Sequence, residues 1–108
     1  MIKKYKLICT VPIAHAEKVR NALGEAGAGK YKNYSFCTFS TRGIGRFRPD
    51  PGAHPAIGEV GKLEEVEEER IECQVDAEVL DDVLKALRKS HPYEEIAYDL
   101  IPLEIHEI

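Results

Sequence analysis

The sequence has little of what disulfide-stabilised, metal-stabilised or membrane-bound proteins depend on. It contains no tryptophan, one methionine and only three cysteines. An odd number of cysteines with no C-x-x-C pair argues against both a disulfide framework and a zinc knuckle. No apolar stretch approaches the length of about 18 residues that suggests a membrane-spanning helix. We therefore expect a globular protein without disulfides or a membrane segment, located in the cytoplasm.

The three cysteines, Cys9, Cys37 and Cys73, each lie in an apolar run that is typical of a strand. Free cysteines in such runs are usually buried and pack like small apolar residues. None has a neighbouring base in the sequence that would activate it as a nucleophile. We expect three buried, reduced thiols and no catalytic cysteine.

The chain also has no excess of positive charge. The chain has 15 Lys and Arg against 19 Asp and Glu, a net charge of -4, which disfavours nucleic-acid binding. The charge is uneven, because acid is concentrated in "EEVEEER", residues 64–70, whereas arginines cluster in residues 42–48. Blocks of acid usually face water, so the acidic run is expected to be a solvated lead into a strand.

Hydrophobic periodicity predicts six elements in the order β-α-β-β-α-β. Alternating apolar residues indicate strands, and apolar residues three and four apart indicate helices. Gly27 is the expected stop of the first helix, and Asp76 is the expected N-cap of the second. The predicted strands are 4–11, 34–41, 69–75 and 96–103, and the predicted helices are 13–27 and 77–89.

This order predicts an α+β fold, the ferredoxin-like βαββαβ sandwich, with one antiparallel four-stranded sheet and two helices on one face. A chain of 108 residues is too short for two cores, so residues 1–108 are expected to form a single domain. The other face of the sheet has no helix to cover it, yet Ile8, Phe39, Ile101 and Leu103 alternate onto it. Such a face needs a second cover, which predicts self-association as a trimer or a dimer.

Residues 40–65 carry almost no helix or strand signal, so a long loop is expected between the second and third strands. A loop of that length in a compact domain is usually functional or disordered. Its "RGIGRFRP" portion is a candidate for binding an anion or the acidic surface of a partner, because arginines bind phosphate in a fork and glycines let the backbone approach it. A turn or bulge with solvated arginines explains the same pattern. The candidates are Arg42, Gly45, Arg46, Phe47 and Arg48.

Two further candidate regions contain histidine. His54 lies in a proline- and glycine-rich part of the loop, which is stiff enough to contact a neighbouring subunit, but it is alone. The "SHPYEE" segment places His91, Tyr93 and Glu94 together, and His91 with Glu94 supplies at most two metal ligands from one turn. The alternative is a helix-stop turn in which the Tyr93 ring packs at the core edge with its hydroxyl paired. Whether a metal is bound is left open, and no catalytic set or cofactor is predicted.

Four segments carry a resemblance to a known family: "VPIAHAEKVRNALGEAGAG", "NYSFCTFSTRGIGRFRP", "HPAIGEVGKLEEVEEERIE" and "HPYEEIAYDL". In this order they resemble the CutA-like insert domain of the YqfO branch of the NGG-interacting-factor family. "HPYEE" also resembles the matching segment of CutA, a trimeric ferredoxin-like protein linked to divalent-metal tolerance. The wider fold group includes the PII signalling proteins, which also carry a long loop between strands 2 and 3.

The resemblance implies the fold more strongly than it implies a function. In the full-length family the insert interrupts a domain with a two-metal site, and no motif of that domain occurs in these 108 residues, so neither metal ligands nor hydrolase activity is carried over. The expected function is that of a small oligomeric regulatory or binding protein. It would bind a divalent metal or a phosphate-bearing metabolite at clefts between subunits. The alternative is an interaction module without a small-molecule ligand, which docks onto a larger protein partner. An enzyme is the least favoured hypothesis.

Overall fold

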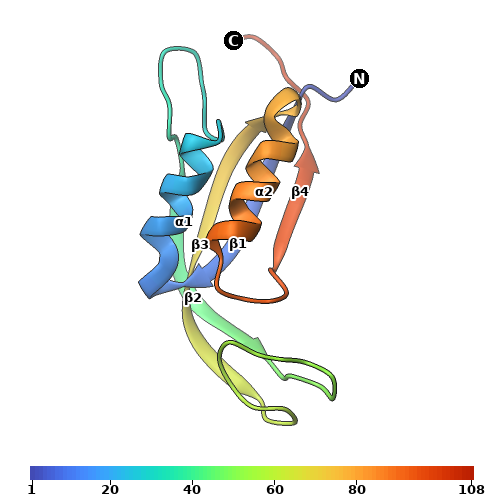
Figure 1. Ribbon diagram of the computed structural model, residues 1–108. Helices are drawn as coiled ribbons and strands as arrows, with labels where there is room; N and C mark the ends of the chain where they lie inside the picture. The colour runs from blue at the N-terminus through green and yellow to red at the C-terminus, as the bar shows by residue number, and fades with distance from the viewer.

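The computed structural model describes all of residues 1–108 and has the predicted order of elements. Figure 1 shows a four-stranded sheet crossed by two helices. The elements are β1 (Lys4–Pro12), α1 (Ile13–Glu25), β2 (Phe39–Phe47), β3 (Glu64–Asp76), a single 3-10 turn (Ala77–Val79), α2 (Leu80–Ser90) and β4 (Tyr98–Pro102). The strand order is β2-β3-β1-β4, and every neighbouring pair is antiparallel. The predicted ferredoxin-like fold is confirmed.

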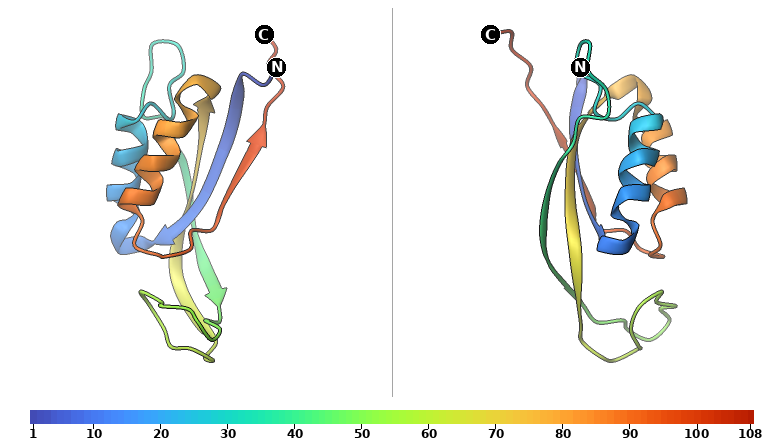
Figure 2. Two further views of the ribbon diagram at one scale, coloured as in Figure 1. Left: turned by 45° about the vertical axis from the view of Figure 1, so that its right-hand side comes forward. Right: turned by 90° about the vertical axis from the view of Figure 1, so that its left-hand side faces the viewer.

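Both helices lie on the same face of the sheet, as the right-hand view of Figure 2 shows. The core lies between these layers. It takes alternate residues from β1 and β3, together with the apolar stripes of the two helices. The largest fully buried side chains are Leu7, Leu23, Ile71, Leu87, Val11, Val19, Val75, Val83 and Cys9.

The second predicted strand is wrong by several residues. Residues 34–38 are aromatic and β-branched, but Lys32 and Phe36 have positive φ angles of 51° and 59°, which no strand accommodates. Residues 29–38 instead form a turn in which the main chains of Tyr31 and Tyr34 bond to each other. β2 begins later, at Phe39, and runs through the arginine-rich segment that was expected to be loop.

The third strand starts earlier than predicted, because the acidic run is part of it. Residues 64–70 pair with β2, so that Arg46 lies opposite Glu65 and Arg42 opposite Glu69. Cross-strand pairs of opposite charge stabilise a hairpin in place of the apolar pairs that sequence patterns detect. The long loop is therefore confined to residues 48–63.

Three smaller expectations can be compared with the structure. Gly27 stops α1 as predicted, since its φ is 108° and the N–H groups of Gly27 and Ala28 bond to the carbonyls of Gly24 and Leu23. Asp76 does not cap the second helix with its side chain, because its carboxylate pairs with Lys4 across the sheet at 3.4 Å. Cys9 and Cys73 are buried, but Cys37 is exposed because it lies in the 29–38 turn and not in a strand.

The hairpin of β2 and β3 extends past the rest of the sheet. β1 ends at Pro12, which pairs with Glu68, so residues 64–67 of β3 have β2 as their only neighbour. We call residues 44–67 the arm; it projects downward in Figure 1. The arm makes the molecule elongated, with extents of 49 × 26 × 23 Å.

Candidate functional site

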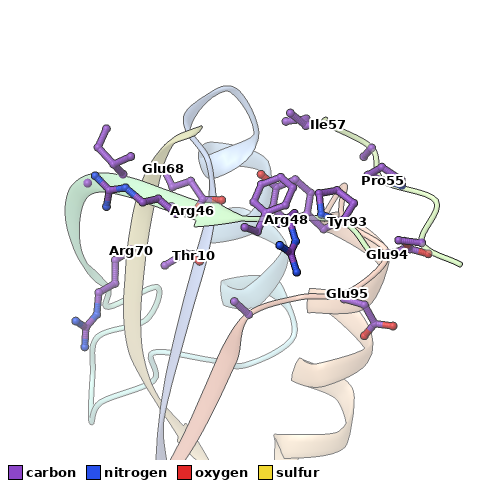
Figure 3. Close-up of a pocket in the computed structure, with 18 of the residues that line it drawn as sticks. Thr10, Arg46, Arg48, Pro55, Ile57, Glu68, Arg70, Tyr93, Glu94 and Glu95 are labelled. Carbon is purple, nitrogen blue, oxygen red and sulfur yellow. The ribbon is translucent and has the colours of Figure 1, made fainter. Parts of the chain in front are cut away.

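A cavity of about 590 Å³ lies between the arm and the turn of residues 91–97 that connects α2 to β4. Figure 3 shows residues that line it, which come from β2, β3, the loop of residues 48–63 and the turn. Its lining combines arginines and carboxylates with the apolar side chains of Ile44, Phe47, Pro55 and Ile57. Cavities of this volume, mostly apolar with a few polar groups, are typical of small-molecule sites.

The turn of residues 91–97 is held firmly against the body of the protein. From the last turn of α2, the guanidinium of Arg88 donates hydrogen bonds to the carbonyls of Tyr93 and Glu94. The imidazole of His91 is buried; its Nε2 donates to the carbonyl of Thr10 at 2.8 Å, and its Nδ1 accepts from the N–H of Tyr93 at 3.1 Å. These contacts fix the backbone that places Tyr93 in the cavity.

The same network shows that His91 is neutral. A ring that donates from one nitrogen and accepts at the other carries a single proton. Burial lowers the pKa of His91, which also favours the neutral form; Arg88 and His15 act in the same direction, and the hydrogen bond to Thr10 opposes it. His91 is therefore a structural support of the turn, with neither ring nitrogen free to bind a ligand.

The arm is tied to the turn at two points. The carboxylate of Glu94 accepts a hydrogen bond of 2.7 Å from the main-chain N–H of His54. The rings of Phe47 and Tyr93 pack edge to face, with centroids 5.8 Å apart. The imidazole of His54 is exposed and takes no part in this contact. The cavity is thus enclosed by contacts between segments that lie some forty residues apart in the chain.

Four arginines surround the cavity, and three of them form exposed ion pairs. Arg46 pairs with Glu65 at 3.1 Å and Arg48 with Asp50 at 3.3 Å. Arg70 lies 3.6 Å from Glu72, and Arg42 has no ion-pair partner. Exposed ion pairs of this kind contribute only about 0–1 kcal/mol each, so these arginines are available to a stronger anionic partner at small cost.

Two polar groups in the cavity are shielded from water. Glu68 is only 7% exposed, and the hydroxyl of Tyr93 is buried without a hydrogen-bond partner. Burial raises the pKa of the Glu68 carboxyl, and the nearby Tyr93 hydroxyl partly opposes that rise. Burial and the charge of Glu68 raise the pKa of Tyr93 to about 12. Both groups therefore favour their neutral, hydrogen-bonding forms more strongly than they would in water.

Gly45 makes room for the carboxyl group of Glu68. A Cβ at position 45 would overlap the Glu68 side chain, whereas a Cβ at Gly43 would meet nothing within 4 Å. The sequence suggested that Gly45 lets backbone approach a phosphate. The structure shows that its missing side chain leaves space for a buried acid.

Seven of the nine predicted binding residues line the cavity, and the two histidines do not. Arg42, Gly45, Arg46, Phe47, Arg48, Tyr93 and Glu94 come together, while His91 lies behind the turn and His54 contributes only its backbone. The segment does end α2, as the helix-stop interpretation has it, but the Tyr93 hydroxyl is buried without a hydrogen-bond partner. Sequence reasoning missed Glu68 and Arg70, because both sit in a run that was interpreted as solvated.

No group of three or more His, Cys, Asp or Glu side chains is arranged to hold a metal ion. The pair foreseen at His91 and Glu94 is not a partial metal site, since His91 already uses both ring nitrogens. A metal site in this protein would need ligands from a second chain.

Comparison with known proteins gives the family. No family model matches the chain. It is 54% identical over 99 residues to the "GTP cyclohydrolase 1 type 2 homolog" of Halalkalibacterium halodurans and to that of Bacillus subtilis, matching 92% of this chain in each case. A Bacillus cereus protein related to NIF3 superposes with a TM-score of 0.84 at 48% identity over 96% of the chain. The chain is a homologue of the CutA-like domain of the NIF3/YqfO family.

The chain spans about a quarter of the length of these NIF3-family relatives: 27% and 26% of the two sequences and 26% of the B. cereus structure. CutA of Archaeoglobus fulgidus superposes with a TM-score of 0.69 over 96% of this chain and 87% of its own, at 19% identity. At that identity the likeness to CutA concerns the fold alone. None of the helices has the length and apolar character needed to cross a membrane.

Proposed function

We propose that this NIF3-family domain is a regulatory or binding unit that takes a small phosphate-bearing metabolite in the cavity between the arm and the 91–97 turn. The observation that carries the proposal is the set of four arginines that line one open cavity, of which Arg42 has no ion-pair partner. A guanidinium group can donate two parallel hydrogen bonds to a phosphate. Such a bidentate interaction is stronger than the exposed ion pairs that these arginines form with carboxylates.

A phosphate-bearing ligand is favoured over a metal by the groups that are present. Four guanidinium groups line the cavity, but no cluster of metal-ligating side chains does. A divalent metal remains the alternative for an oligomer in which two chains share a site. Arginines of the arm would contact the ligand, so ligand binding would hold the arm against the turn of residues 91–97. A protein partner would then recognise the surface formed by the arm and the turn.

Thermal shift measurements test the proposal. Metal-free protein is heated with inorganic pyrophosphate, with ribose 5-phosphate, and with Mg²⁺, Mn²⁺, Zn²⁺ or Cu²⁺ alone. A ligand that binds only the folded state adds about 2.7 kcal/mol of stability at a hundredfold excess over its Kd. We expect a shift with the phosphate compounds that is lost in Arg42→Ala and in the double variant Arg46→Ala/Arg48→Ala. Lys85→Ala, an exposed cation on α2 outside the cavity, is the matched control.

Two results contradict the proposal. The first is a melting temperature that is unchanged by every phosphate compound. The second is a shift that is the same in the arginine variants as in Lys85→Ala, since it would place the ligand elsewhere. A shift with metals only would favour the metal-binding alternative.

Self-association is a further part of the proposal. The face of the sheet opposite the helices carries Ile8, Phe39 and Ile101, with Phe39 67% exposed, although Lys6, Arg70 and Glu72 lie among them. β2 and β4 are both open edge strands, which favour pairing with another chain. Light scattering on a size-exclusion column tests this; a monomer at all concentrations would contradict it.

An interaction surface is the second candidate function, and a separate observation favours it. The 29–38 turn exposes Tyr31, Tyr34 and Phe36 at the end of the molecule where both termini lie (Figure 1). Exposed aromatic residues in a group are typical of protein interfaces. Binding of a larger protein that is weakened by Tyr34→Ser, with no dependence on phosphate compounds, would support this function over the first.

A further inference from the structure

The arginines do not explain the whole cavity. They are exposed, whereas Glu68 and the Tyr93 hydroxyl are shielded from water within the same space. Figure 3 shows Glu68 reaching in from β3 and Tyr93 from the turn. A buried polar group without a partner is unfavourable, and such groups in native proteins call for an explanation such as a ligand that is yet to bind.

Local structure keeps these two groups where they are. Gly45 leaves space for the Glu68 carboxyl, because any side chain at that position would displace it. Arg88 and His91 fix the backbone on both sides of Tyr93. Several independent contacts thus hold Glu68 and the unpaired Tyr93 hydroxyl in one cavity, which is the preorganisation that ligand sites require.

We propose that Glu68 and Tyr93 recognise an uncharged, planar edge with an N–H donor beside an acceptor, as found in a nucleobase or another cyclic amide. This rests on the proposed function, since the anionic end of the same ligand lies among the arginines. The ligand class is a nucleotide-like molecule: a flat nitrogen heterocycle joined to a phosphate.

Three properties of the cavity support an uncharged edge over a charged one. A carboxyl group offers acceptor oxygens and, when protonated, a donor beside them, and a tyrosine hydroxyl adds a group that does either. Burial raises the pKa of the Glu68 carboxyl, and the surrounding arginines disfavour a cationic ligand group. The packed rings of Phe47 and Tyr93 supply flat apolar surface on which a ring can lie.

The experiment compares ligands that differ only in the heterocycle. Uridine 5′-monophosphate and guanosine 5′-monophosphate carry a cyclic amide, and ribose 5-phosphate lacks the base. Isothermal titration calorimetry is used to measure the Kd of each probe with the wild type, Arg42→Ala, Tyr93→Phe and Glu68→Gln. Tyr98→Phe is the control, because Tyr98 is an exposed tyrosine outside the cavity lining.

We expect at least one nucleotide to bind the wild type about tenfold or more tightly than ribose 5-phosphate. Tyr93→Phe removes only one oxygen atom, so it should weaken nucleotide binding by up to about tenfold, the effect of one hydrogen bond. It should leave ribose 5-phosphate unchanged, and Tyr98→Phe should change neither. Glu68→Gln should also alter nucleotide binding alone, whereas Arg42→Ala should weaken all three probes.

The two proposals fail in different ways. If ribose 5-phosphate binds as tightly as both nucleotides and Tyr93→Phe changes nothing, the inference about the heterocycle is wrong while the phosphate site stands. If no probe binds, both are wrong. If the nucleotides bind with Kd values that Arg42→Ala leaves unchanged but Tyr93→Phe raises, the polar edge is recognised and the phosphate assignment is wrong.

Discussion

The two ends of β3 lie in very different surroundings. Its C-terminal half pairs with β1 throughout and with β2 as far as Glu72, it packs against both helices, and Ile71, Cys73 and Val75 are buried there. Its N-terminal part belongs to the arm, where residues 64–67 have one neighbouring strand and lie beyond the reach of the core cluster. One strand therefore belongs first to the proposed binding surface and then to the core.

The difference shows how a chain of 108 residues separates stability from recognition. The core is built from apolar residues that any similar side chain of the right volume would replace at modest cost. The arm is held by charge pairs, a ring contact and one hydrogen bond to Glu94, which together leave polar groups available. The following predictions test whether the two regions are as separate as their contacts indicate.

The largest contrast is expected between two isoleucines. Ile71→Ala removes a fully buried side chain, which should lower the free energy of unfolding by about 2–5 kcal/mol. Ile44→Ala makes the same chemical change on the arm, where the side chain is 48% exposed, and should cost less than about 1 kcal/mol. Urea denaturation of both variants measures the difference. Equal losses would show that the arm is part of the cooperative core.

The second prediction concerns the link between the regions. Arg20 of α1 pairs with the Glu69 carboxylate, which is only 7% exposed and also accepts a hydrogen bond from Ser40 at 3.0 Å. Arg20→Ala leaves a shielded carboxylate without its cation, which should cost about 1–3 kcal/mol in urea denaturation. The double variant Arg20→Ala/Glu69→Gln should recover part of this loss. A double variant no more stable than the single one would contradict the role of the pair.

A third test separates the two glycines of β2, Gly43 and Gly45. Gly45→Ala would force the Glu68 side chain out of its place, so it should destabilise the protein by about 1–2 kcal/mol and change the binding of any cavity ligand. Gly43→Ala meets no atom within 4 Å and should be neutral within about 0.5 kcal/mol. Thermal denaturation and titration with the same ligand compare the two. Similar behaviour would mean that the Glu68 carboxyl is free to move.

The smallest effect is expected from pH, acting through His91. The pKa of His91 is lowered in the folded state, so the unfolded chain binds the proton more readily. The contribution of His91 to the free energy of unfolding is fully present above the pKa of the unfolded chain, about 6.5. It is lost as the pH falls through the lower pKa of the folded state, by at most about 1.4 kcal/mol per pH unit. His91→Gln should remove this slope below about pH 6.5. Urea denaturation at several pH values measures it, and an unchanged slope would assign the effect to other groups.

The sequence predicted the packed region well for a physical reason. Burial on one face imposes alternation on β1 and on residues 71–75, and it imposes the stripe Val83, Leu84 and Leu87 on α2. These patterns follow from the core and do not depend on a particular partner segment. The helix stop at Gly27 was also readable, because the left-handed conformation there favours glycine.

The structure of the arm could not be predicted from hydrophobic periodicity in the same way. Its strands are defined by pairing between Arg and Glu residues that are some twenty positions apart, and neither segment shows apolar alternation. Glu68 looked like one of several solvated acids; in the hairpin it pairs with Gly43, its carboxyl group lies against Gly45, and it is buried. The signal that would have found it is charge complementarity between "RGIGRF" and "EEVEEE", read as a hairpin. Conversely, residues 34–38 of the 29–38 turn were predicted as strand because Tyr34 and Phe36 have high strand propensity.

The continuity of β3 has a consequence for dynamics. The amide groups of residues 64–67 lie on the arm outside the core, whereas Ile71, Cys73 and Val75 are buried, so residues 64–67 should exchange with solvent deuterium far faster than residues 71–75. Glu68 lies where the slow and fast segments meet, because it pairs with Pro12, the last residue of β1. A molecule held at Glu68 would therefore extend the slow-exchanging segment into the arm, and the extent of deuterium uptake at residues 64–67 would report the occupancy of the cavity.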